Sequence, residues 1–150
     1  MSDQQVFLGI VRAAETLTRH LTDVLEPFRL TLSQYSVLDS LRDANETGLA
    51  CGELADRLIT RDPDITRLVD RLETRGLVTR HRGRPDRRVV RMQITAEGRL
   101  LLQQLDEPIG QLHARHLAPM GKRNLSTLSS LLKATDGSGN PSGRHVRSLD

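Results

Sequence analysis

The apolar residues of this chain recur mostly at helical intervals. Near the N-terminal end, six of them follow one another at spacings of three or four, which predicts a helix over residues 3–26 with one apolar face. They are Val6, Ile10, Ala14, Leu17, Leu21 and Val24. Ser2 or Asp3 can cap this helix, and Pro27 lies where it would stop. So long an apolar stripe needs a partner, either its own domain or a second copy of the chain.

Shorter helices are predicted next, over residues 33–43, 52–59 and 63–75, with a loop at 45–49 between the first two. Ser33 is a plausible N-cap of the first of them. For the third, Asp62 is a good N-cap, and Pro63 occupies the first helical position, where a missing N–H costs nothing. Gly76 can end that helix in the left-handed conformation.

After Gly76 the period changes from helical to alternating. Residues 77–82 and 88–94 read as two strands separated by the turn sequence GRPDR, which predicts a β-hairpin. Thr95 can then cap a helix over residues 96–117. The pattern therefore predicts a mainly α fold with a small β-hairpin.

The last part of the chain contains one more amphipathic pattern, over residues 122–134. Residues 136–150 are rich in Gly, Ser and Pro and lack an apolar pattern, so we expect this tail to be disordered. Taken in order, the elements are those of a winged helix-turn-helix: two short helices joined by a turn, followed by a hairpin that serves as the wing.

Charge is concentrated in the middle of the chain. The formal net charge is only +3, but residues 57–99 hold twelve Arg against six Asp or Glu. Residues 80–90, RHRGRPDRRVV, contain five of these arginines. So many like charges on a turn indicate an anionic partner, and the Arg fork matches phosphates and guanine edges. Because the chain has two Phe, one Tyr and no Trp, duplex DNA is favoured over stacking on single strands.

The sequence contains only weak signals for redox chemistry or metal binding. Cys51 is the only cysteine, which excludes an intrachain disulfide and leaves only a weak redox candidate. His113 and His116 lie three apart, but the simpler interpretation is polar surface positions rather than a metal site. His81 is interpreted as an extra donor or a structural residue. We expect no metal and no cofactor. With no signal peptide pattern and no apolar run of transmembrane length, we expect a soluble, cytoplasmic protein without a membrane partner.

Three segments together resemble the MarR (multiple antibiotic resistance regulator) family of winged helix-turn-helix transcriptional regulators. They are GELADRL (52–58), DPDITRLVDRLETRGLVTR (62–80) and RPDRRVVRMQITAEG (84–98). The resemblance extends over residues 5–135 and implies a homodimer on a pseudo-palindromic operator, with half-sites roughly 10 bp apart. It also implies a transcriptional repressor, relieved by a small phenolic or lipophilic ligand.

The resemblance further implies a domain organisation. Residues 1–30 would form an N-terminal dimerisation helix, and residues 31–98 the winged helix-turn-helix domain that binds double-stranded DNA. Residues 99–135 would form the C-terminal dimerisation helices, followed by the disordered tail at 136–150.

Pro63, Arg67 and the run Asp86-Arg87-Arg88 match positions of the family. The full set of candidate DNA contacts lies at a helix start, in a recognition helix at 63–75 and in a wing at 82–88. These are Ser33, Gln34, Pro63, Asp64, Thr66, Arg67, Arg71, Arg84, Asp86, Arg87 and Arg88. The recognition helix would lie in the major groove and the wing in the minor groove. Arg87 is favoured over Arg88 for minor-groove insertion, and Asp86 would hold the wing by pairing with an arginine.

Several of these assignments have alternatives. Asp64 either accepts a hydrogen bond from cytosine or stabilises the helix N-terminus. Arg71 and Arg75 are either peripheral DNA contacts or solvated charge, and solvated charge is the favoured interpretation for Arg75. An effector cleft would be lined by residues of the first and second helices, namely Leu8, Arg12, Glu15 and Leu38.

Two other classes of function compete with this interpretation. An enzyme would need a catalytic constellation, a phosphate-cradling glycine loop or a metal motif, and none occurs in the sequence. The other is a winged helix that contacts protein or RNA. Steep salt dependence of binding to duplex DNA, together with sequence preference, would distinguish the DNA-binding regulator from it.

Overall fold

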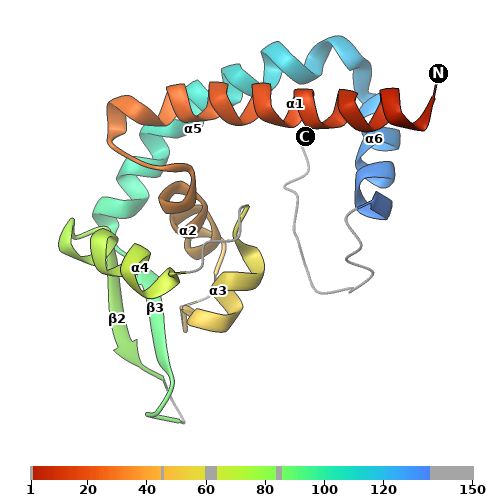
Figure 1. Cartoon of the computed structure of the whole chain (residues 1–150). Coiled ribbons are helices and arrows are strands. Elements are labelled where there is room, and N and C mark those ends of the chain that lie inside the picture. Colours follow the sequence, from red (N-terminus) through yellow and green to blue (C-terminus); the bar gives the residue numbers. More distant parts are fainter. Residues whose placement is uncertain (1, 45, 60–63, 84–85, 136–150) are drawn as a thin grey trace. The chain divides into compact units, whose positions relative to one another are not determined.

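The computed structural model of this chain describes residues 2–44, 46–59, 64–83 and 86–135. It is mostly helical with one small antiparallel sheet, as the apolar pattern predicts (Figure 1). In chain order the elements are α1 (Asp3–Leu25), η1 (Glu26–Phe28), α2 (Leu32–Arg42), β1 (Leu49–Ala50), α3 (Cys51–Arg57), α4 (Ile65–Thr74), β2 (Val78–Arg82), β3 (Val90–Ile94), α5 (Ala96–Leu117), η2 (Ala118–Met120) and α6 (Gly121–Thr135).

The chain divides into two compact units, the first ending at Ile109 and the second beginning at Gly110. The first unit contains everything from α1 to the first half of α5. The second contains the rest of α5, η2 and α6, and the predicted tail at 136–150 lies outside the described residues. Helix α5 continues through Pro108 to Leu117, although a proline has no N–H to donate to the preceding turn.

Helix α1 begins at a capping box. The Ser2 hydroxyl accepts the N–H of Gln5 at 3.3 Å, and the Gln5 side chain accepts the N–H of Ser2 at 2.9 Å. This confirms Ser2 as the cap and the predicted helix to within one residue of its end. Within the described residues, no helix is long and apolar enough to cross a membrane.

Helix α2 starts earlier than predicted because Thr31, rather than Ser33, is its N-cap. The Thr31 hydroxyl accepts the N–H of Gln34 at 3.1 Å, and the Gln34 amide oxygen accepts the N–H of Thr31 at 3.0 Å. This reciprocal pair satisfies two N–H groups that the first turn leaves unpaired. The Thr-x-x-Gln spacing in the sequence is the signal that could have identified this cap.

Helix α4 starts later than the predicted 63. Its N-cap is Asp64, whose carboxylate accepts the N–H of Arg67 at 3.0 Å, and its first helical residue is Ile65. The predicted cap Asp62 and the predicted first residue Pro63 lie outside the described residues. Gly76 follows the helix at φ +71°, which confirms the glycine that ends it.

The sheet has the strand order β1-β3-β2, all antiparallel. Strands β2 and β3 form the predicted hairpin, with Val78 opposite Ile94 and Arg82 opposite Val90 (Figure 1). The predicted loop at 45–49 is wrong at its end, because Leu49 and Ala50 form β1 against Met92 and Arg91. This third strand joins the middle of β3 to the start of α3.

The hydrophobic core of the first unit gathers Leu side chains from most of its elements. Fully buried members include Leu25 of α1, Leu38 of α2, Leu54 of α3, Leu72 of α4 and Leu102 of α5, with Met92 from the sheet. Thr95 links the hairpin to α5, since its hydroxyl accepts the N–H of Gly98 at 3.0 Å and donates to the Gly76 carbonyl at 2.7 Å. This confirms Thr95 as a helix cap and fixes the C-terminal end of α4 next to the start of α5.

Candidate nucleic-acid interface

Helix α4 has one apolar and one polar face. Leu68, Val69 and Leu72 are buried in the core, so the residues between them point outward. The exposed ones include Thr66, Arg67, Asp70, Arg71 and Thr74. An exposed helix face of this length, rich in Arg, has the dimensions and chemistry that suit a DNA groove.

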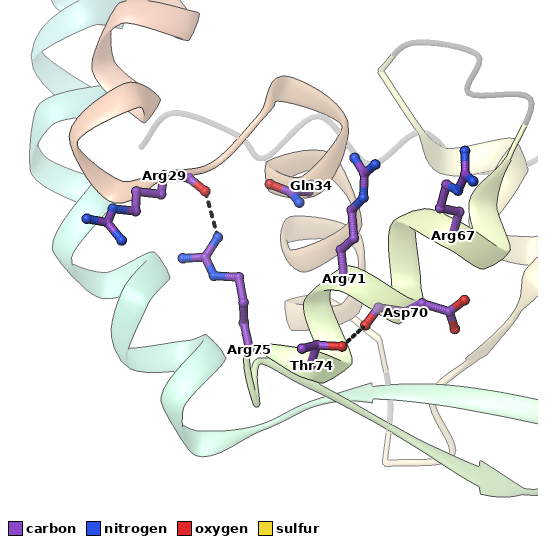
Figure 2. Close-up of a pocket in the computed structure, with 7 residues that line it drawn as sticks. All are labelled: Arg29, Gln34, Arg67, Asp70, Arg71, Thr74 and Arg75. Atoms are coloured by element: carbon purple, nitrogen blue, oxygen red, sulfur yellow. Dashed lines mark hydrogen bonds between the residues drawn. The ribbon is translucent and has the colours of Figure 1, made fainter.

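A groove runs alongside this polar face, between α4 and the start of α2. It has a volume of about 530 Å³ and is lined by Arg29, Gln34, Arg67, Asp70, Arg71, Thr74 and Arg75 (Figure 2). Four of these seven residues are arginines and one is an acid, so the groove attracts anions.

The guanidinium groups of Arg67 and Arg71 extend from the same side of α4 (Figure 2). The Arg67 side chain is 73% exposed and lies 3.9 Å from the Asp64 carboxylate, which is a weak ion pair at best. Arg67 and Arg71 therefore present donors that a phosphate or a base edge can accept. The Asp64 carboxylate caps the helix, which supports the helix-stabilising alternative for that residue.

Gln34 and Ser33 sit at the start of α2, at the opposite side of the groove. Gln34 is buried, and its side-chain oxygen is used by the capping box. Gln34 also lines the groove, and the NH₂ group of its amide is a hydrogen-bond donor. Ser33 is half-buried on the same helix.

Hydrogen bonds to main-chain atoms stabilise the hairpin turn. The Asp86 carboxylate accepts the backbone N–H of Arg88 at 2.9 Å, and the Gly83 N–H donates to the Val89 carbonyl at 2.7 Å. The prediction paired Asp86 with an arginine side chain; among the described residues, its contact with an arginine is to the backbone. Arg87 and Arg88 are both exposed beside this turn, and the predicted contact Arg84 lies outside the described residues.

Arg80 connects the hairpin to α4, a role the sequence interpretation missed. Its guanidinium lies 2.5 Å from the Asp70 carboxylate and 2.6 Å from that of Glu73, and it donates to the Thr66 carbonyl at 3.2 Å. Burial alone would lower the pKa of Arg80, but the hydrogen bonds and charges of Asp70 and Glu73 outweigh it and raise the pKa. Arg80 lies on the inward side of its strand, together with Val78. A charged residue at an inward position was the sequence signal that could have indicated this structural role.

Arg75 is also structural, which corrects its interpretation as solvated charge. Its guanidinium donates to the Arg29 carbonyl at 2.6 Å (Figure 2) and to the Phe28 carbonyl at 3.1 Å. The basic middle of the chain therefore contains two kinds of arginine. Arg75, although exposed, and Arg80 bind other parts of the fold, whereas the exposed Arg67, Arg71, Arg87 and Arg88 can offer their guanidinium groups to a partner.

The remaining candidates do not gather into a second site. Cys51 is exposed at the first residue of α3. In the part of the chain that the structure describes, no three His, Cys, Asp or Glu side chains come together in a way that would hold a metal ion. Of the suggested effector-lining residues, Leu8, Arg12 and Glu15 are exposed on α1, whereas Leu38 is fully buried in the core.

Comparison with known proteins gives a consistent result. Residues 30–90 match the MarR family. A crystal structure of a MarR transcription factor from Planctomyces limnophilus is 36% identical, with 89% of this chain and 97% of that chain covered and a TM-score of 0.68. A mutant of MarR from E. coli, solved in complex with operator DNA, is 30% identical, with 88% and 95% covered and a TM-score of 0.74.

Among curated relatives, the HTH-type transcriptional regulator TtmR of Methylorubrum extorquens (strain PA1) is 36% identical over 104 residues. That match covers 69% of this chain but only 52% of TtmR, so the chain spans about half the length of this relative. These similar proteins are transcription regulators and not enzymes.

Proposed function

Because the chain belongs to the MarR family of helix-turn-helix transcriptional regulators, we propose that it binds a specific operator as a homodimer. In this proposal α4 lies in the major groove and the wing, residues 82–88, reaches the minor groove. The observation that carries it is the arginine groove beside the exposed face of α4. Arg67 then contacts base edges, while Arg71 and the Gln34 amide contact phosphates.

The homodimer is supported by the apolar face of α1. Val6, Ile10 and Leu17 lie on one side of the helix and remain 38–43% exposed in a single chain. A stripe of partly exposed apolar side chains is typical of an interface with another protein. In the second unit, Leu131 and Leu132 of α6 are likewise exposed, at 60% and 42%.

Repression, and its relief by a small phenolic or lipophilic ligand, complete the proposal. We infer both from membership of the family and propose them for this chain as hypotheses. Leu8, Arg12 and Glu15 are the residues that such a ligand would meet on α1.

The experiment that tests the proposal is fluorescence anisotropy on the DNA directly upstream of this protein's own gene. A scrambled duplex of equal length serves as the control, at roughly physiological salt, where unspecific binding is weak. We expect tight binding to the upstream duplex alone, with two chains bound per site. Equal, weak binding to both duplexes would leave the fold intact and remove the upstream DNA as the operator.

Arg87→Ala is expected to weaken binding to the operator by about 1–3 kcal/mol, because a minor-groove contact is lost. Arg88→Ala is the matched control, since both residues are exposed beside the same turn. Anisotropy titrations of both variants measure the effect. If Arg88→Ala shows the larger loss, Arg88 is the inserted residue; an unchanged affinity in both would remove the wing arginines from DNA recognition.

A further inference from the structure

We propose that Arg75 is a positioning residue that fixes the recognition helix α4 to the end of the dimerisation helix α1. It thereby sets which half-site spacing the dimer accepts. The inference rests on the proposed function, because it assumes a dimer on a two-part operator. It concerns a residue that has no direct contact with DNA in that proposal.

The geometry is a bridge between segments far apart in the chain. The two terminal nitrogens of the Arg75 guanidinium donate to the carbonyls of Arg29 and Phe28, 46 and 47 residues away. Figure 2 shows the first of these bonds. Arg75 is itself the C-cap of α4, and its backbone N–H donates to the Arg71 carbonyl. The bridge therefore starts at the last turn of the helix that carries Arg67 and Arg71.

At its other end, the bridge meets a turn in an unusual conformation. Arg29 has φ +53° and is the one non-glycine residue with positive φ among the described residues. This left-handed conformation is unfavourable for a residue with a side chain and persists only where its surroundings hold it. Here the Arg29 N–H donates to the Glu26 carbonyl at 2.9 Å, while the Arg29 carbonyl accepts from Arg75.

The connection between α1 and α2 is consequently a defined turn rather than a loose linker. The Leu30 N–H reaches back to the carbonyl of Leu25, the last residue of α1, at 3.4 Å, and Thr31 then caps α2. Arg75 contacts the middle of this turn. A planar fork that makes two bonds fixes direction as well as distance, which the single ammonium of a lysine cannot do.

In a dimer, this bridge acts on the distance between the two recognition helices. The half-sites of a two-fold operator lie one helical turn apart, and each added base pair moves a half-site by about 3.4 Å. If the apolar face of α1 forms the dimer interface, the link from α1 to α4 passes through the turn that Arg75 holds. Loosening that link lets each recognition helix follow a displaced half-site.

The test uses a duplex recovered by the wild-type protein from a random-sequence library. The same half-sites are then re-spaced by one base pair in either direction. Anisotropy titrations compare wild type, Arg75→Gln, Arg75→Lys, Arg29→Gly and Arg71→Gln at several salt concentrations. Thermal unfolding of each variant establishes that it is folded. If Arg75→Gln does not fold, Arg75→Lys alone is compared with the wild type.

We expect the wild type to bind the duplex with the original half-site spacing about tenfold or more tightly than the re-spaced duplexes. For both Arg75 variants this ratio of affinities should be less than about threefold. Their salt dependence should match wild type, because Arg75 contacts carbonyls and not phosphate. Arg71→Gln should instead lower the salt slope by about one and keep the spacing preference. Arg29→Gly retains both acceptor carbonyls and tolerates the left-handed conformation, so it should also keep the preference.

An undiminished spacing preference in the Arg75 variants would overturn the inference while leaving operator binding intact. A reduced salt slope in those variants would also overturn it, since Arg75 would then be a phosphate contact. A full wild-type spacing preference in Arg75→Lys would also overturn the inference, because a positive charge without the two-bond bridge would then be sufficient. Failure of the wild type to recover any duplex would instead contradict the proposed function itself.

Discussion

Gly48→Ala is expected to destabilise the protein by about 3 kcal/mol, whereas Gly76→Ala should cost about 1 kcal/mol. Both glycines have φ +71°, so both substitutions carry the same left-handed backbone penalty. They differ in their surroundings. A Cβ at Gly48 would lie within 3.0 Å of the Met92 main chain and the Gln93 side chain, whereas a Cβ at Gly76 meets nothing within 4 Å.

Gly48 immediately precedes β1, and its close approach to β3 is what lets the third strand pair. The Gly48 carbonyl also accepts from the Arg91 guanidinium at 2.9 Å, so a displaced Gly48 disturbs that contact too. Urea unfolding of both variants at one protein concentration measures the two free energies, since the stability of a dimer depends on concentration. Equal losses would mean that β1 moves aside freely and that the close approach does not stabilise the sheet.

The helices and the hairpin could be predicted because their apolar periods are long and uninterrupted. Helix α1 and the β2–β3 hairpin appear within one or two residues of their predicted bounds. Strand β1 could not be predicted in this way, since two residues show no alternation. Its existence depends on Met92, which is more than forty residues further along the chain.

Helix starts were harder, because several adjacent residues had suitable side chains. Thr31 and Ser33 are both good caps, as are Asp62 and Asp64, and sequence preference ranks them almost equally. For α2 the reciprocal hydrogen bonds with Gln34 decide in favour of Thr31, and in α4 the carboxylate of Asp64 reaches the N–H of Arg67.

The candidate site could be located from sequence, but the roles of its arginines could not be assigned. A run of positive charge predicts an anion-binding region without saying which side chains the fold itself uses. Arg75 finds its partners in a turn near the start of the chain, and Arg80 finds carboxylates on the neighbouring helix. The strand alternation places the Arg80 charge on the inward side, but the partners of both arginines depend on tertiary structure and cannot be identified from local spacing.

Arg80→Gln is expected to weaken operator binding by about 2–4 kcal/mol, more than the loss of either wing arginine. Two effects add in the same direction. The hairpin loses its bond to α4, so the wing and the recognition helix no longer hold one relative position. The carboxylates of Asp70 and Glu73 also lose their counter-charge, and Asp70 lines the groove where phosphate is expected.

Arg42→Gln is the matched control. Arg42 likewise pairs with two carboxylates, Asp39 and Asp106 at 2.6 Å each, but it joins α2 to α5 and does not line the arginine groove. Both substitutions should therefore lower stability by similar, small amounts, because all four carboxylate side chains are 37–55% exposed. Only Arg80→Gln should weaken DNA binding strongly.

Adding Asp70→Asn to Arg80→Gln separates the two effects. The second substitution removes the unpaired negative charge without restoring the bond between the hairpin and α4. A double variant that recovers part of the lost affinity, with a coupling of about 1 kcal/mol, assigns that part to charge and the remainder to wing position. Full recovery would mean that Arg80 acts only by neutralising Asp70. No recovery would assign the whole effect to the placement of the wing against the recognition helix.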